Sequence, residues 1–413
     1  MNILVIGNGF DLAHGLPTKY TDFLEFVKVI KQIINPPYYN GQNQIEWGNL
    51  CPKVRKQIEK NMGNVRNSLY SQESMWKDLI GDNLWIDYFL QNPMYQKENW
   101  IDFENEISKV IQSLDGDMHG LAGAYNIDDN VTTLSNSFLN ERYSKYTYPL
   151  QSMNMLTDGK VWENITFKEI RNKLLNDLNK LIRALEIYLC EYVEKMQIKK
   201  KSPDIDKLEI GAILSFNYTH IYSKLYSISN RFKQVVADPY DFIHGEANID
   251  CTIESNNMVL GIDEYLPDDR KNTDIEFIAF KKYYQRIYNQ TGCRYKDWVD
   301  QIIQGWKDIG NDIKRQYNIQ IPYEKVPNKC RNQLFIFGHS LDATDGDILR
   351  ELILKDNVYT TIFYHNKETM GQQVANLVKA IGQDELIRRT GGNTKTIEFK
   401  LQQDMVPIEN SSL

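Results

Sequence analysis

The chain has 413 residues, of which 42% are hydrophobic and 25% charged, and this ordinary globular composition excludes a mainly disordered chain. Its formal net charge of −7 disfavours a surface that grips nucleic acid over its whole extent. The five cysteines are scattered and form no CxxC pair, which predicts reduced thiols in a cytoplasmic protein and excludes a zinc ribbon.

The chain opens with a short apolar run, Asn2–Ile6, which predicts a strand because no basic segment precedes it as in a signal peptide. No stretch approaches the roughly 18 apolar residues of a membrane helix, so we expect a soluble protein without a membrane partner. After the strand, paired glycines let the backbone turn sharply and approach a phosphate closely. The candidate nucleotide-binding residues here are Gly7, Asn8, Gly9, Phe10 and Asp11. A tight turn without a ligand is the alternative, and Leu12 at the third glycine position disfavours a conventional dehydrogenase.

A helix is predicted from Thr18, as its cap, to Ile34. Residues 36–204 then break the strand–helix rhythm and predict a mainly helical insertion. Its longest helix, Trp162–Met196, carries a leucine-rich stripe at helical spacing. We interpret the stripe as core, with the seam of a homo-oligomer as the alternative. Lys199–Lys201 beside Pro203 predict a solvated linker.

The sheet is expected to resume near Ile210. Continuous apolar runs predict strands at Ala212–Phe216, Phe242–His244, Met258–Leu260, Gln333–Phe337 and Val358–Tyr364. Helical patterns follow at Asp345–Leu354 and Glu368–Ile381. Strand-then-helix order predicts an α/β fold with a doubly wound, mostly parallel Rossmann-like sheet. The predicted domains are a nucleotide-binding core (1–35 and 205–413) and the helical insertion (36–204).

Polar motifs follow three of these strands. Asn217 is expected at the carboxyl edge of the sheet, where open α/β folds bind ligands, although it would also suit a helix cap. His244 beside Gly245 is a candidate general base, with a structural histidine as the alternative. The third motif supplies further candidate nucleotide-binding residues, namely Gly338, His339, Ser340, Asp342 and Asp345.

Two other kinds of site remain open at this stage. Asp342 stands where a nucleophile elbow needs glycine, which disfavours a serine hydrolase built on Ser340. A divalent cation is the other alternative, and it would make the chain a metal-dependent hydrolase or nuclease. Its expected ligands are Asp11, His14, Asp342 and Asp345, whose competing interpretation is helix caps and solvated carboxylates.

Taken together, the motifs resemble a known family. The stretch IGNGFDLAHGLPTKYTDFL is similar to the opening of the bacteriophage abortive infection AbiH family. The later blocks FNYT, HG, FGHSLDATD, IFYHNKE and QQVANLVKAIGQDELI resemble those of the same family. This resemblance implies phage exclusion by abortive infection, with a trigger that the sequence does not identify.

The same blocks, in the same order, are similar to those of sirtuin-like NAD-binding domains. That resemblance implies NAD+ as the substrate, with Asn217 holding a water or ribose hydroxyl and His244 as general base. It further implies hydrolysis of the nicotinamide–ribose bond rather than deacylation, because the deacylase zinc module has no counterpart here. Thr219 stands where an aspartate is expected, and Asp11 where a small hydroxyl residue is expected. A non-catalytic nucleotide sensor is the remaining alternative.

Overall fold

The computed structural model falls into two compact units. The first comprises Met1–Leu16, Met196–Glu246 and Gln290–Leu413, and the second comprises Pro17–Lys195 and Ala247–Asn289. The structure describes residues 1–35, 45–63, 69–125, 167–229, 238–317, 331–355 and 357–408. The domain boundaries expected from the sequence remain a prediction.

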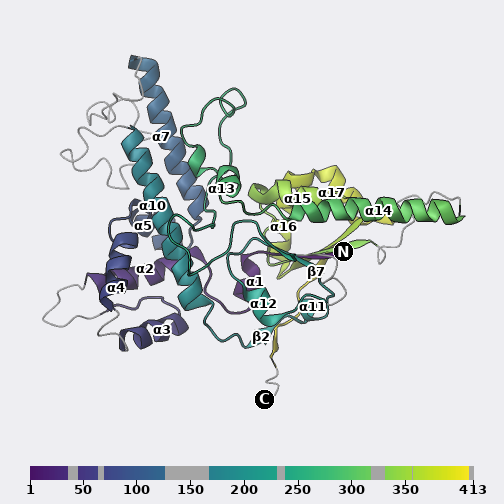
Figure 1. The fold of residues 1–413 in the computed structure, drawn as a ribbon, viewed down its shortest axis with the longest axis horizontal. Coiled ribbons are helices and arrows are strands. Elements are labelled where there is room, and N and C mark those ends of the chain that lie inside the picture. Colours follow the sequence, from purple (N-terminus) through teal and green to yellow (C-terminus); the bar gives the residue numbers. More distant parts are fainter. Residues whose placement is uncertain are drawn as a thin grey trace. The chain divides into compact units, whose positions relative to one another are not determined.

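The first unit is built on a six-stranded, fully parallel sheet (Figure 1). Its strands, from one edge to the other, are β4 (Tyr240–Phe242), β3 (Ala212–Ser215), β1 (Asn2–Ile6), β5 (Asn332–Phe337), β6 (Val358–Tyr364) and β7 (Ile397–Leu401). Counted in chain order within the sheet, this is 3-2-1-4-5-6, the doubly wound arrangement. The structure therefore confirms the predicted Rossmann-like α/β fold. Its topological switch point lies between β1 and β5, where the strand order reverses.

Helices flank the sheet because its strands are apolar on both faces. One face, which we call the core face, carries Ile3, Val5 and Leu214. It packs against four helices, α14 (Tyr295–Tyr317), α15 (Gly346–Ile353), α16 (Lys367–Ile381) and α17 (Gln383–Thr390). Figure 1 shows the short helices α1 (Asn8–Ala13) and α12 (Ile221–Leu225) on the other side of the sheet. Shorter elements of this unit are α11 (Pro203–Asp206), η6 (Ala343–Asp345) and η7 (Gly392–Thr394).

Several predicted strands need correction. Met258–Leu260 is not a strand: the run is buried in the second unit without a sheet partner, so its apolar character reflects burial alone. The strand predicted at Phe242–His244 is β4, which ends at Phe242 and leaves His244 in the loop after it. Strand β7 was not predicted, and its outer residues Lys400 and Leu401 are exposed, as is usual for an edge strand.

Two local predictions were also wrong. Lys200–Lys201 is not a linker but β2, which pairs antiparallel with β8 (Val406–Pro407). The helix expected from Thr18 is α2 (Tyr20–Ile34), whose N-cap is Lys19. The Asp22 carboxylate accepts the backbone N–H of Lys19 at 3.0 Å and so satisfies a donor at the helix start. This acidic first-turn residue, rather than the threonine, defines the helix start.

The second unit is largely helical. Besides α2 it contains α3 (Pro52–Gly63), α4 (Leu69–Trp76), η1 (Lys77–Gly81), α5 (Leu84–Gln91), α6 (Pro93–Glu98), α7 (Phe103–Tyr125), α10 (Phe167–Tyr188), η2 (Leu189–Val193), η3 (Ile278–Phe280) and α13 (Lys282–Tyr288). The predicted helix Trp162–Met196 corresponds to α10 and η2, and its residues before 167 lie outside the described part of the chain. The leucine-rich stripe of α10 is fully buried, so it forms core and offers no seam to a second copy.

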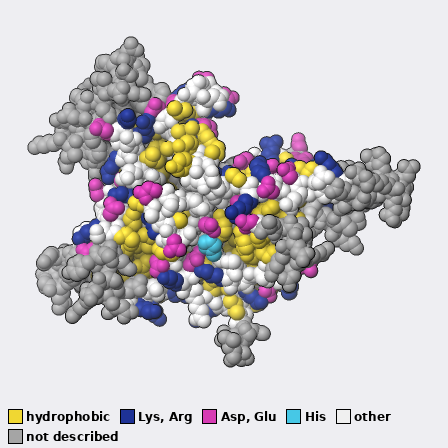
Figure 2. Space-filling model, in the orientation of Figure 1, with side chains coloured by type: hydrophobic (Ala, Val, Ile, Leu, Met, Phe, Trp, Pro, Cys, Tyr) yellow, Lys and Arg dark blue, Asp and Glu magenta, His cyan; other side chains and the backbone are white. Residues whose placement is uncertain are grey.

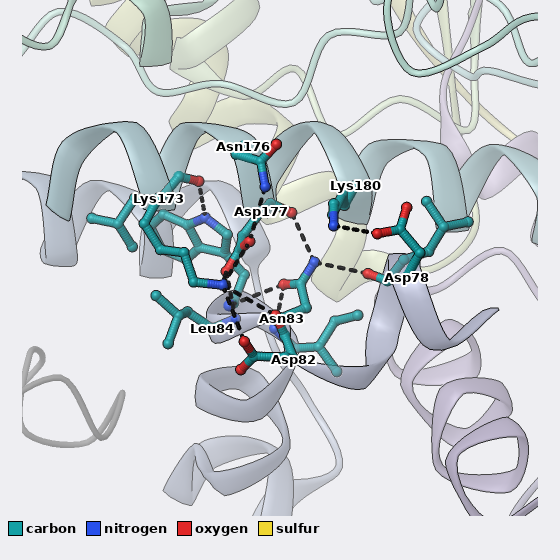
Figure 3. A network of polar contacts seen from close by, with 12 residues as sticks. Asp78, Asp82, Asn83, Leu84, Lys173, Asn176, Asp177 and Lys180 are labelled. Atoms are coloured by element: carbon teal, nitrogen blue, oxygen red, sulfur yellow. Dashed lines mark hydrogen bonds and ion pairs between the residues drawn. The ribbon is translucent and has the colours of Figure 1, made fainter. Parts of the chain in front are cut away.

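A buried polar network joins α5 to α10 in this unit (Figure 3). The Asn83 side chain caps α5 by accepting the backbone N–H groups of Trp85 and Ile86. Its amide nitrogen donates to the Asp177 carbonyl at 2.8 Å, and the Asp177 carboxylate accepts the backbone N–H of Leu84 at 3.0 Å. Lys173 provides the countercharge at 3.0 Å. The network satisfies polar groups that would otherwise be buried without partners.

Candidate functional site

The four polar motifs of the sequence lie together at one edge of the sheet. The register pairs Ile6 with both Ser215 and Phe337, and Ser215 with Phe242, so β1, β3, β4 and β5 end at the same level. The segments that follow these strands, which include helix α1 and η6, carry all the predicted site residues. This carboxyl edge, with its switch point between β1 and β5, is where doubly wound folds bind ligands.

The two glycine turns at the switch point pack backbone against backbone. The Gly9 N–H donates to the Gly338 carbonyl at 2.8 Å, and Gly338 has φ of +67°. A Cβ atom at Gly338 would lie 2.1 Å from the backbone nitrogen of Phe10, and one at Gly7 would lie 2.8 Å from the Gly338 oxygen. These glycines are therefore required by the contact between the two turns, a reason that the sequence did not reveal.

Asn217 braces the first of these turns. Its side-chain nitrogen Nδ2 donates to the Gly7 carbonyl at 3.0 Å, and its backbone N–H donates to Ser215 Oγ at 3.1 Å. Helix α12 begins later, at Ile221 with His220 as N-cap, so Asn217 is not the helix cap that the alternative required. Within the described residues its Oδ1 accepts no hydrogen bond. Asn217 thus presents an acceptor at the sheet edge while its nitrogen is held.

Asp11 and Thr219, the two departures from the sirtuin-like pattern, contact each other. Thr219 Oγ1 donates to Asp11 Oδ2 at 2.6 Å, and the two residues are only 3% and 1% exposed. The neighbouring Phe10 is fully buried and packs against the rings of Tyr222 and Phe337. The side chains of Phe10 and Asp11 therefore point into the protein, whereas Asn8 between the glycines is exposed.

Two histidines share one carboxylate at the same edge. Asp345 Oδ1 lies 3.3 Å from His244 Nε2, and Asp345 Oδ2 lies 3.6 Å from His339 Nε2. All three residues are buried. His339 Nδ1 accepts the backbone N–H of Leu341 at 2.9 Å, which assigns the Nε2–H tautomer to this ring and directs its hydrogen toward Asp345. His244 forms no hydrogen bond through Nδ1 within the described residues.

The ring of Phe216 lies beside both histidines. Its centroid is 5.6 Å from that of His244 and 4.3 Å from that of His339, in edge-to-face geometry with each. Phe216 belongs to the core face of the sheet, so the two imidazole rings pack against the hydrophobic core of the first unit. His244 is therefore a base candidate oriented by a carboxylate, the arrangement in which an imidazole works as a general base.

Two buried side-chain amides of helix α16 hydrogen-bond to the backbone of the loop after β5. Gln373 Nε2 donates to the His339 carbonyl at 3.0 Å, and Asn376 Nδ2 donates to the Ser340 carbonyl at 3.1 Å. Leu341, buried in this loop, has a left-handed backbone with φ of +60°, which is uncommon for a residue other than glycine. Gln373 and Asn376 were not predicted from the sequence. Their signal was two polar residues three positions apart on an otherwise apolar helix face.

Ser340 and Asp342 are exposed at the same loop. The Asp342 carboxylate accepts the backbone N–H of Thr344 at 3.1 Å, as expected of a loop carboxylate. His14 is buried away from the sheet edge, with Nδ1 2.7 Å from the Phe10 carbonyl and Nε2 2.9 Å from the Tyr226 hydroxyl. Both nitrogens of its ring are engaged, which removes it from the cation ligand set considered above. Across the described ranges, no group of three or more His, Cys, Asp and Glu side chains is placed to hold a metal ion.

The acidic and basic side chains are interspersed on the face of the molecule seen in Figure 2. No helix in the described part of the chain has the length and apolar character needed to cross a membrane.

Comparison with known proteins gave one match. The family model described as "Bacteriophage abortive infection AbiH" matches residues 3–365. This range includes the glycine turns, Asn217, His244 and Asp345, and it ends before Gln373. Neither the curated proteins nor the solved structures gave a match.

Proposed function

Since the chain belongs to the bacteriophage abortive infection AbiH family and so acts in phage defence, we propose that it does so by hydrolysing NAD+ at the nicotinamide–ribose bond. The observation that carries the proposal is the His244 imidazole oriented by Asp345 beside Asn217, at the carboxyl edge of a 3-2-1-4-5-6 sheet. Nucleotides bind at this edge in doubly wound folds, next to the switch point.

The reaction needs a base and hydroxyl positioning more than a strong nucleophile. The C–N bond between ribose and nicotinamide breaks, its electron pair leaves with the nicotinamide ring, and positive charge develops on the ribose. Water adds to the ribose carbon and gives its proton to Nδ1 of His244, which yields nicotinamide, ADP-ribose and one proton. The Asp345 carboxylate stabilises the imidazolium that forms. Such a base contributes about 10²–10⁴-fold to the rate.

The other residues of the site have supporting roles in this scheme. Asn217 Oδ1 accepts a hydrogen bond from the water or from a ribose hydroxyl, while Nδ2 remains on the Gly7 carbonyl. His339 is a positioning residue, because its fixed Nε2–H faces Asp345. Asn8, Ser340 and Asp342 are exposed at the edge and accessible to the nucleotide.

Asp11 and Thr219 depart from the residues expected of a sirtuin-like site, and they hydrogen-bond to each other at 2.6 Å. Because the Asp11 carboxylate points inward to this partner, its charge is directed away from a diphosphate at the glycine turns.

The test is turnover of NAD+ by the purified full chain, with nicotinamide and ADP-ribose followed by chromatography. We expect His244→Ala to lower the rate about 10²–10⁴-fold and Asn217→Ala to lower it strongly, with both variants still folded by circular dichroism. His365→Ala is the matched control, since this exposed histidine also follows a strand of the sheet but contacts none of the three site residues.

Wild-type rates in both site variants would contradict these roles. If the wild-type chain binds NAD+ saturably and returns it unchanged, the protein is a nucleotide sensor rather than a hydrolase.

A further inference from the structure

A hollow lies on the face of the sheet opposite the core face. It has a volume of about 380 Å³ and lies among the ends of β1, β3 and β4, helix α12 and the start of α14. Side chains alternate along a strand, so Ile213 and Ser215 border this hollow while Leu214 and Phe216 belong to the core face. Its volume lies within the range of small-molecule pockets, about 300–1,000 Å³.

Two residues that border the pocket also bond to residues of the candidate site. Ser215 borders the pocket, and its Oγ donates to the Asn217 carbonyl at 2.9 Å. Thr219 borders the pocket as well, and it holds Asp11 of the first glycine turn. The pocket therefore shares Ser215 and Thr219 with the segments that carry Asn217 and the first glycine turn.

The walls of the pocket suit a flat ring. Tyr222, Tyr240 and Phe242 contribute aromatic surface, with the Tyr222 and Tyr240 rings 6.5 Å apart at a steep angle. Burial raises the pKa of both tyrosines above its usual value, so their hydroxyls stay protonated and available as donors. Aromatic walls of this kind bind planar heterocycles by stacking and edge contacts.

The charges of the pocket argue against a phosphate group. Arg294 pairs with Asp238 at 2.7 Å and His220 with Glu246 at 2.8 Å, so each basic group already faces a carboxylate. A phosphate group would be repelled by the carboxylates of Asp238 and Glu246, and the two basic side chains that could attract it are already paired with these carboxylates. A ring that carries N–H donors instead gains from the Glu246 carboxylate, because a hydrogen bond to an ionised acceptor is stronger than a neutral one.

We propose that this pocket receives the base end of the nucleotide, a planar nitrogen heterocycle with an amide or amino group that donates to Glu246. The identity of the ligand as a nucleotide rests on the proposed function. Both ends of NAD+ have this chemistry, the nicotinamide amide and the adenine amino group, and the experiment distinguishes them.

The test measures binding of nicotinamide mononucleotide and of AMP to the full chain by calorimetry. Ser223 is exposed on α12 and borders the pocket, so Ser223→Trp places a large ring in it. Lys224→Trp is the matched control, because Lys224 is exposed on the same helix but does not border the pocket. We expect Ser223→Trp to weaken one of the two probes about tenfold or more, while Lys224→Trp leaves both unchanged. The weakened probe identifies the end of the nucleotide that binds.

Glu246→Gln is the second variant, which keeps the shape of the pocket and removes the charge. It should weaken the same probe about tenfold, the effect of one hydrogen bond to a charged group. The proposal that the pocket binds a nucleotide base is overturned by either of two results. One is wild-type affinity for both probes in both variants, and the other is no binding of either probe to the wild-type chain. If the wild-type chain does not hydrolyse NAD+ but the variants still lose one probe, the proposed function fails and the pocket stands.

Discussion

His14 and His244 are both buried in the first unit, and the partners of their ring nitrogens separate their roles. His14 has the Phe10 carbonyl on one nitrogen and the Tyr226 hydroxyl on the other, so the neutral ring is part of the packing. His244 has a carboxylate beside Nε2 and no bonded partner at Nδ1 within the described residues. Only the second arrangement leaves a basic atom for a proton. Residue type alone does not distinguish them, so the sequence left both as candidates.

The buried His14 predicts a loss of stability in mild acid. Desolvation lowers its pKa, an effect that the hydrogen bond to the Phe10 carbonyl only partly offsets. In the unfolded chain the ring is protonated below about pH 6.5, whereas the folded chain resists the proton. The stability from the neutral ring is therefore complete above about pH 6.5 and is lost as pH falls, by at most about 1.4 kcal/mol per pH unit.

The measurement is urea unfolding of the wild-type chain and of His14→Gln at pH 7.5 and pH 5.5. Glutamine offers the same donor and acceptor but does not titrate, so this variant should lose less stability between the two pH values. Equal losses in the two proteins would show that His14 titrates as freely when folded as when unfolded.

At the scale of elements, the sequence predicted the interior strands well and the others poorly. Strands β1, β3, β5 and β6 are mostly apolar and largely buried, as is usual for strands that are covered on both faces. The edge strand β7 has polar and exposed residues, so the same criterion missed it. The run Met258–Leu260 satisfied the criterion without being a strand, since burial in the helical unit produces the same composition.

Placement of the site residues depended on the same strands. Asn217 and His244 were expected at the sheet edge because each follows an apolar strand, and the structure places them there. The contacts of Asp345 with both histidines and of α16 with the following loop were not predictable, because they depend on how a loop folds back across the sheet edge.

At the level of a single helix, the Asn83 cap of α5 predicts a loss of stability when it is removed. Asn83 is fully buried, caps α5 and donates to carbonyls within η1 and within α10. Asn83→Ala removes the cap and leaves buried N–H and C=O groups without partners, so we expect it to lower the free energy of unfolding by about 2–3 kcal/mol. Denaturant unfolding measures this.

Asn176→Ala is the control for that measurement. Asn176 belongs to the same network (Figure 3), but it is exposed and its contact with Asp177 is 3.5 Å long. Its removal should change the free energy by less than about 0.5 kcal/mol. Similar losses for the two variants would mean that the buried cap contributes nothing beyond an ordinary surface residue.

At the scale of the whole molecule, the two units are interleaved in sequence, but the candidate site residues belong to only one of them. The first unit is assembled from three segments of the chain and the second from two. All the candidate catalytic and nucleotide-binding residues, and the pocket beside them, belong to the first unit. The helical unit has its own buried core around α10. The proposed chemistry therefore predicts a ligand footprint confined to the first unit, whereas a nucleotide sensor that recognises its ligand through the helical insertion predicts a footprint in the second.

Hydrogen exchange with and without NAD+ separates these two expectations. A ligand that binds only the folded state slows local opening of the segments it contacts. We expect added protection in the loops after β1, β3, β4 and β5, and none in α5, α7 and α10. Using His244→Ala keeps the NAD+ intact during labelling, because this variant retains the binding residues but lacks the proposed base. Protection restricted to the helical unit would place the ligand away from Asn217 and would favour the sensor.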